Sequence, residues 1–293
     1  MREFFRYLKN EIYNIFHSKS FLIVLSILSV IVIIDSFLAY SDYKNNLAET
    51  LNNIAMTDGV YETYPFLQLY TVYNSWIGGR VNTILTTVFF NTLPIFVVIP
   101  YGWSFLSEQK RGYDRIMACK LGKKKYFLGK HASCFISGFI TATIPLLISL
   151  GITFATIPAY KPDINLALYY QVNHNKLLGD LYYLHPLCTV FLNVLMNGLF
   201  AGAWTTVPLA LSFFVKNKYI VLFAPYLVLI YLIALFEKAS AFRLYIGTSI
   251  INYIWLTSPD STQSWAFYLT VMLLLILVPL GIVIERGKRA DVY

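Results

Sequence analysis

The sequence predicts an all-α integral membrane protein with six transmembrane helices, an N-terminal interfacial amphipathic helix and both termini in the cytoplasm. Hydrophobic residues make up 57% of the 293 residues and charged residues only 13%, a balance outside the range of soluble domains. Apolar runs of about 20 residues recur along the chain, and this length crosses the ~30 Å hydrocarbon core of a bilayer. Lysine and arginine gather at the ends of these runs.

The distribution of basic residues predicts the orientation of the spans. Cytoplasmic loops of membrane proteins carry an excess of lysine and arginine. Residues 107–130 lie between two apolar runs and hold eight of the 23 basic residues, and 17 of the 23 fall in segments expected inside. Topology therefore explains the net charge of +8, and we expect no nucleic-acid partner.

A single transmembrane domain is expected to cover residues 1–293. Residues 1–19 repeat an apolar face at helical spacing, so they form either the interfacial helix or a plain helical lead-in to the first span. A cytoplasmic loop occupies 107–130. The six expected spans are residues 20–40, 81–106, 131–156, 188–215, 219–236 and 266–284.

Two of these spans carry informative residues. Gly198, Ala201, Gly202 and Ala203 in the fourth span are small, and small residues let helices approach closely, so we expect a packing face there. Asp35 lies near the far end of the first span. A carboxylate at membrane depth is costly and favours a role in a translocation path, but its place near the end of the span favours hydration at the outer interface.

The segment 41–80 has few basic residues and is expected outside the cell. Aromatic rings prefer the membrane–water interface, so those of this segment are expected to anchor there rather than to line a ligand vestibule. They are Tyr61, Tyr64, Phe66, Tyr70, Tyr73 and Trp76. Residues 244–256 are apolar but too short to span, and it stays open whether they re-enter the membrane or lie on it.

The sequence contains no recognisable catalytic pattern. Its four histidines and three cysteines have no spacing that would bind a metal or pair as a framework. Residues 122–131, GKKKYFLGKH, differ from a phosphate-binding loop because six residues separate the glycines where four are needed. We therefore expect no catalytic site, no metal site and no cofactor bound by this chain.

The loop 107–130 holds an ordered set of acidic, glycine, apolar and basic positions. They are Ser107, Glu108, Arg111, Gly112, Ile116, Met117, Gly122 to Tyr126, and Lys130. This pattern resembles the loop between the second and third spans of ABC-2-type exporter permeases, and the predicted layout of the whole chain is similar to that family. The chain departs from the family at Leu121-Gly122, where many members carry proline.

The resemblance implies a membrane-spanning permease subunit of an ABC exporter. Such a subunit moves a hydrophobic or amphipathic substrate outward by alternating access, and a peptide antibiotic, a drug or a lipid-linked molecule would fit. ATP and magnesium would be bound by separate ABC ATPase subunits, and a second permease chain, identical or related, would complete the transporter in a bacterial plasma membrane. The family's coupling helix would correspond to residues 108–119, with coupling residues Glu108, Arg111, Gly112, Asp114, Arg115, Ile116 and Met117.

The substrate path is expected between the two permease chains. Its candidate lining consists of Asn82, Asn91, Asn193, Asn197 and Trp204, although asparagines in spans also bond to neighbouring helices. Two other functions stay open. One is a non-transporting assembly or sensor subunit that uses the same loop to hold a partner, and the other is a membrane-embedded enzyme.

Overall fold

A computed structural model describes residues 2–56, 69–80, 83–164, 167–172, 175–240, 253–257 and 263–289, and within these ranges the regular structure is helical. Five helices in these ranges are long and apolar enough to cross a membrane. They are α2 (Lys19–Met56), α7 (Lys123–Thr156), α10 (Pro186–Leu211), α11 (Lys218–Ser240) and α13 (Trp265–Arg289). The shorter helices are α1 (Arg2–Phe16), α3 (Val72–Ser75), α4 (Ile84–Phe96), α5 (Ser104–Arg111), α6 (Tyr113–Leu121), α8 (Ala167–Tyr170) and α9 (Gly179–Leu184).

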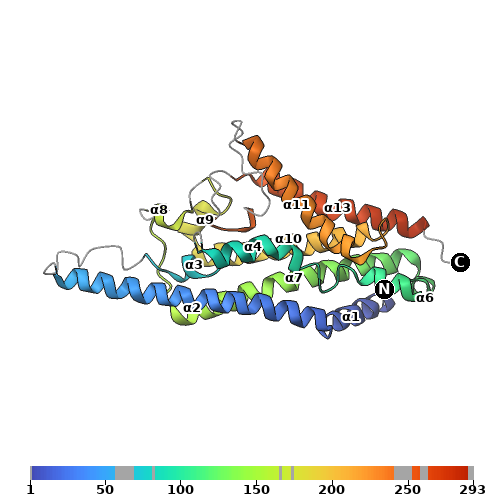
Figure 1. The fold of residues 1–293 in the computed structure, drawn as a ribbon, viewed down its shortest axis with the longest axis horizontal. Helices are drawn as coiled ribbons and strands as arrows, with labels where there is room; N and C mark the ends of the chain where they lie inside the picture. Colours follow the sequence, from blue (N-terminus) through green and yellow to red (C-terminus); the bar gives the residue numbers. More distant parts are fainter. Residues whose placement is uncertain are drawn as a thin grey trace.

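The long helices form an elongated bundle with α7 and α10 at its centre (Figure 1). Helices α1 and α6 and the C-terminal end of α13 lie at one end of the bundle, which we name the α6 end. Helices α3, α8 and α9 lie at the opposite end, which we name the α3 end. The cytoplasmic location of both termini stays a prediction.

Small residues hold α7 and α10 together. A Cβ atom at Gly138 would lie 2.4 Å from the carbonyl oxygen of Ala201, and one at Gly202 would lie 2.8 Å from that of Phe135. A Cβ at Gly198 would meet the Thr143 side chain at 2.5 Å. These approaches leave no room for side chains, so the packing face predicted on the fourth span is confirmed and its partner is α7.

The expected second span, residues 81–106, is not one continuous helix. Helix α4 has 13 residues, roughly 20 Å at 1.5 Å per residue, and residues 97–103 form turns before α5 begins. Pro100 lies in these turns and supplies no backbone N–H, which opposes helix continuation. The backbone carbonyls at the break are bonded from α10, because the Trp204 indole donates to Pro94 at 3.0 Å and the Thr205 hydroxyl to Val97 at 3.4 Å.

Other boundaries also shift from those predicted. Helix α2 continues past residue 40 to Met56, since residues 41–56 contain neither proline nor glycine to end it. Its 38 residues reach about 57 Å, so part of it projects beyond a ~30 Å hydrocarbon core. Helix α7 begins at Lys123, and the last third of the expected loop 107–130 is therefore helical.

Exposed apolar side chains cover the outward faces of the long helices. Soluble proteins rarely expose contiguous apolar surface of this extent, and a bilayer accounts for it. Examples with more than half of their surface exposed are Leu22, Ile23, Phe37, Leu227, Tyr231, Leu269, Leu273 and Leu277. Together with the five span-length helices, these faces make the chain a multi-pass membrane protein.

The aromatic residues after α2 differ from the prediction where the structure describes them. Tyr73 and Trp76 are buried in the core, at 7% and 0% exposure, so they do not anchor the surface to an interface. Tyr61, Tyr64 and Phe66 lie outside the described residues. Of the apolar segment 244–256, residues 253–256 are described, and they are buried against the bundle.

Replacing Gly138 by alanine tests the contact between α7 and α10. The new Cβ would collide with the Ala201 carbonyl, and overpacking of this kind costs about 1–3 kcal/mol. We expect a lower midpoint in thermal unfolding of the detergent-solubilised chain. Gly151→Ala on the same helix is the control, because no atom outside the neighbouring backbone of its own helix lies within 4 Å of the place that its Cβ would take. Equal midpoints for the two variants would contradict the proposed contact.

Candidate functional site

A buried polar cluster joins four segments at the α6 end of the bundle. We name it the Lys130 cluster. It consists of Glu11 on α1, Tyr101 in the turns before α5, Glu108 on α5, and Tyr126 and Lys130 on α7. Because these side chains come from separate parts of the chain, the cluster fixes how α1 and the loop sit on α7.

Lys130 is the centre of this cluster. Its side chain is 0% exposed, and its ammonium donates to Glu108, to the Tyr101 hydroxyl at 2.7 Å and to Glu11 at 3.5 Å. The ammonium also lies 4.4 Å from the centre of the Tyr101 ring. An ammonium has three donors, and all three have partners here, so the burial of this charge is compensated.

The two carboxylates of the cluster are held by tyrosine hydroxyls as well. Tyr101 donates to Glu11, and Tyr126 donates to Glu108 at 2.7 Å. Burial raises the pKa of the Glu108 carboxyl, and the attraction of Lys130 offsets this only in part. The folded chain then binds this proton more tightly than the unfolded chain, so the group lowers stability as the pH rises from 4.5 through its folded pKa.

Helix α1 lies against α7 at the cluster. A Cβ at Gly129 would meet the Tyr7 ring at 2.7 Å, so the helix backbone and the ring are in direct contact. Burial, and then the charges of Glu11 and Glu108, raise the pKa of the Tyr7 phenol. The buried positions of α1 are Tyr7, Glu11 and Ile15, spaced four residues apart, and this spacing was the available signal that Glu11 points inward.

The predicted coupling residues lie on two helices rather than one. Gly112 has a φ of 69°, a left-handed conformation that suits glycine, and it separates α5 from α6. The expected helix over 108–119 is therefore interrupted at this residue. Glu108 belongs to the Lys130 cluster, whereas Ile116 is 66% exposed on α6.

The remaining coupling residues differ in their exposure. Arg111 and Arg115 are exposed, and Gly112, Asp114 and Met117 are partly buried. Met117 packs against the apolar core beneath the loop. The loop thus presents an apolar and basic outer face while Glu108 holds its inner face to α7.

The candidate substrate-path residues that the structure describes have different surroundings. Asn193 and Asn197 on α10 are buried and donate to the Ile254 carbonyl at 3.2 and 2.8 Å, which anchors residues 253–257. Asn91 is exposed on α4, and the Trp204 indole is bonded to the Pro94 carbonyl at the end of that helix. Asn82 lies outside the described residues.

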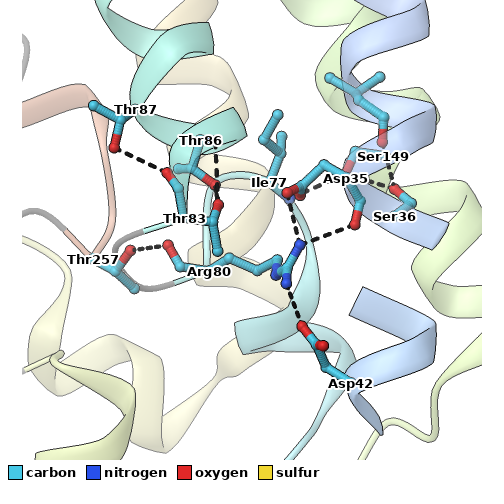
Figure 2. A network of polar contacts seen from close by, with 11 residues as sticks. Asp35, Ser36, Asp42, Ile77, Arg80, Thr83, Thr86, Thr87, Ser149 and Thr257 are labelled. Atoms are coloured by element: carbon cyan, nitrogen blue, oxygen red, sulfur yellow. Dashed lines mark hydrogen bonds and ion pairs between the residues drawn. The ribbon is translucent and has the colours of Figure 1, made fainter. Parts of the chain in front are cut away.

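A second ionic network centres on Arg80 (Figure 2). The Arg80 guanidinium donates to the Asp35 carboxylate at 2.7 Å and to Asp42 at 2.5 Å. It also donates to the Asp35 backbone carbonyl at 3.0 Å, while the Arg80 carbonyl accepts from Thr257 at 2.8 Å. These bonds link α2 to the segments that contain Arg80 and Thr257.

The hydration predicted for Asp35 is wrong. Its side chain is 0% exposed, and the charge is compensated by Arg80, which the sequence placed 45 residues away. The neighbouring Ser36 bonds to Ser149 of α7 at 3.3 Å, and Ser149 accepts from the Ile77 backbone at 3.1 Å (Figure 2). A buried carboxylate at this depth is therefore part of the connection between α2 and the bundle.

A small polar cavity of about 260 Å³ adjoins this network. Tyr70, Tyr169, Asn74 and Asp42 are among the residues that line it. Burial, followed by the charge of Asp42, raises the pKa of the Tyr70 phenol. Tyr70 belongs to the outer segment for which a ligand vestibule was the alternative to interface anchoring, and it lines this cavity.

The described segments contain neither a cluster of metal-ligand residues nor a disulfide. No group of three His, Cys, Asp or Glu side chains there is placed to hold a metal ion. Cys119, Cys134 and Cys188 are all free.

The chain matches no protein-family model, no curated protein and no solved structure.

Lys130→Met tests the Lys130 cluster. The substitution leaves Glu11 and Glu108 buried without their cation, and breaking a buried ion pair from one side costs about 3–5 kcal/mol. We expect a marked loss of thermal stability in detergent, with partial recovery in Lys130→Met/Glu108→Gln. Lys125→Met, at an exposed position of the same helix, is the control and should leave the midpoint near that of the wild type.

A double-mutant cycle tests the unequal strength of the two Arg80 pairs. Asp35 is 0% exposed and Asp42 48% exposed, and exposed pairs contribute only about 0–1 kcal/mol. We expect the Arg80–Asp35 coupling energy from Arg80→Leu and Asp35→Asn to exceed the Arg80–Asp42 coupling energy from Arg80→Leu and Asp42→Asn. Unfolding midpoints of the single and double variants measure both couplings, and equal values would contradict the structure.

Proposed function

We propose that this chain is the permease subunit of an ATP-driven exporter of the ABC-2 type, and that the loop containing α5 and α6 docks on a separate ATPase subunit. The observation that carries the proposal is the combination of an exposed docking face and a buried anchor in one short loop. Ile116 is exposed at one side of this loop, and Glu108 bonds to buried Lys130 at the other.

The outer face of the loop has the chemistry of a docking surface. Ile116 offers 66% of its surface and Tyr113, three residues before it on α6, offers 40%, and exposed apolar residues of this kind are typical anchors of a contact with a partner protein. Arg111 and Arg115 provide basic groups at its rim, and such rim charges favour association and orientation.

The inner face of the loop supplies a path for movement. A displacement of α5 would act on α7 through the Glu108–Lys130 and Glu108–Tyr126 contacts. The same lysine contacts Glu11, so α1 would follow. Because α7 packs along α10, which also contacts α13, a push on the loop would reach the centre of the bundle and support alternating access.

The remaining parts of the proposal follow from this role. ATP and magnesium would be held by the ATPase partner, and this chain would have no catalytic site of its own. A second permease chain, identical or related, would share the substrate path. We propose a hydrophobic or amphipathic substrate, such as a peptide antibiotic, a drug or a lipid-linked molecule, and a bacterial plasma membrane with the α6 end in the cytoplasm.

One observation favours a second candidate function. The polar cavity at the α3 end is lined by Tyr70, Tyr169 and the Asp42–Arg80 pair, which suits ligand detection at the outer side. A sensor or assembly subunit would use the same loop to hold its partner and would move no substrate. ATP-dependent substrate movement therefore separates the two functions.

Co-purification tests the docking face directly. Wild-type chain is extracted from its native membrane beside Ile116→Asp, and any bound subunit is identified and assayed for ATPase activity. We expect a nucleotide-binding subunit with the wild type and at least a tenfold lower yield with Ile116→Asp, since a buried charge replaces an apolar anchor.

The control is Ile164→Asp, an exposed isoleucine at 47% exposure outside this loop. It should keep the partner at the level of the wild type. Recovery of no ATPase with any variant, or equal recovery with both substitutions, would count against the docking role of α6.

A further inference from the structure

An apolar crevice runs between α11 and α13, with α10 as its floor. Two adjoining cavities of about 520 and 330 Å³ form it, and they share Val207, Leu211 and Leu275. Helix α11 packs on α10 and α4, whereas α13 packs on α10 and α7. Residues of α10, α11 and α13 line the crevice.

The crevice opens to the face that contacts lipid. Its wall residues Val228, Leu274 and Val278 are each more than half exposed, like the other outward apolar side chains of α11 and α13. Pro279 removes the N–H that would bond to the Leu275 carbonyl, and the Thr206 hydroxyl donates to this carbonyl at 3.4 Å. The lining therefore offers an occupant apolar contact and almost no polar contact.

Basic residues flank the crevice where it nears the α6 end. The Arg286 guanidinium of α13 lies 4.8 Å from the centre of the Phe214 ring, and Phe214 is itself a lining residue. Lys218 begins α11 two turns before the lining residue Pro225, and its ammonium lies 5.8 Å from the centre of the Trp103 ring and 4.9 Å from that of Tyr219. Lys216 adds a third exposed cation in the connection between α10 and α11.

Few acidic residues oppose these cations. The sequence from 181 to 236 contains no aspartate or glutamate, and Glu285 is the acidic residue next to Arg286. The surface therefore combines the apolar crevice with basic residues at one end. An amphiphile with an apolar tail and an anionic head complements both parts.

We propose that this crevice binds an anionic glycerophospholipid, with an acyl chain along α10 and the phosphate between Arg286 and Lys218. Clusters of lysine and arginine beside membrane helices attract anionic lipid head groups at about 1 kcal/mol per charge. A second copy of this chain fits less well, because a two-fold interface would bring the same cations together. The proposal is independent of the exporter function.

Lipid retention by the purified full-length chain tests the proposal. The chain is delipidated in mild detergent and titrated with phosphatidylglycerol or phosphatidylcholine, and bound lipid is counted by native mass spectrometry while the thermal midpoint is recorded. We expect one tightly retained phosphatidylglycerol that raises the midpoint, and weaker retention of phosphatidylcholine. Inorganic phosphate alone should give no shift, since it makes no contact with the apolar crevice.

Two variants separate head-group binding from tail binding. Arg286→Gln/Lys218→Gln should lower the apparent affinity for phosphatidylglycerol roughly 25-fold, about fivefold per lost charge, and abolish the preference over phosphatidylcholine. Val207→Phe narrows the crevice and should reduce retention of both lipids with the cations intact. Lys161→Gln, at an exposed position outside the crevice, is the matched control and should retain lipid like the wild type.

Three results would overturn the proposal. They are equal retention of the two lipids by the wild type, unchanged preference in the double Gln variant, and a lipid-free dimer whose crevice residues are protected by the second copy. Each variant is compared only where size-exclusion chromatography shows a monodisperse, folded chain. If Val207→Phe fails this criterion, the charge variants and their control still decide the outcome.

Discussion

The burial of Lys130 is the constraint on which the α6 end of the structure depends. An uncompensated ammonium in an apolar interior is very unfavourable, so α1, α5 and the turns after α4 must each bring an acceptor to one point on α7. Glu11, Tyr101 and Glu108 do this from three separate segments. The position of the basic loop relative to the spans is thus set by the hydrogen bonds and ion pairs that Lys130 and Glu108 make with each other and with Glu11 and Tyr101.

The same rule explains the broken segment between α2 and α7. Helix α4 ends after 13 residues, and carbonyls released at the break are bonded by Trp204 and Thr205 of α10. Irregular backbone at membrane depth persists only where protein supplies the missing hydrogen bonds. In the described structure, Trp204 and the buried asparagines of α10 donate these hydrogen bonds. Helix α10 therefore supplies the bonds that the neighbouring irregular segments lack.

Local sequence patterns predicted the features that depend on length and spacing. Five apolar spans, the amphipathic α1 and the small-residue face of α10 follow from hydropathy, helical periodicity and side-chain volume. The polar clusters did not follow, because Glu11 lies 119 residues from Lys130 and Asp35 lies 45 residues from Arg80. Pairings over such distances are fixed by tertiary packing, and a single sequence contains no local signal for them. The interruption at Gly112 was likewise hidden, since glycine at a helix end and glycine within a helix look alike in sequence.

The length of α2 has a mechanical consequence. The helix is joined to the bundle through Asp35 and Ser36, and residues beyond Asp42 continue without a break to Met56, a further ~20 Å of rise. The part before Asp42 packs along α7 and into the core, with Val24, Leu28 and Val32 buried, so any tilt of this part would be transmitted along the continuous helix to its end. A small tilt of the spanning part is therefore amplified into a larger sideways displacement of the tip, far from the segment where the tilt begins.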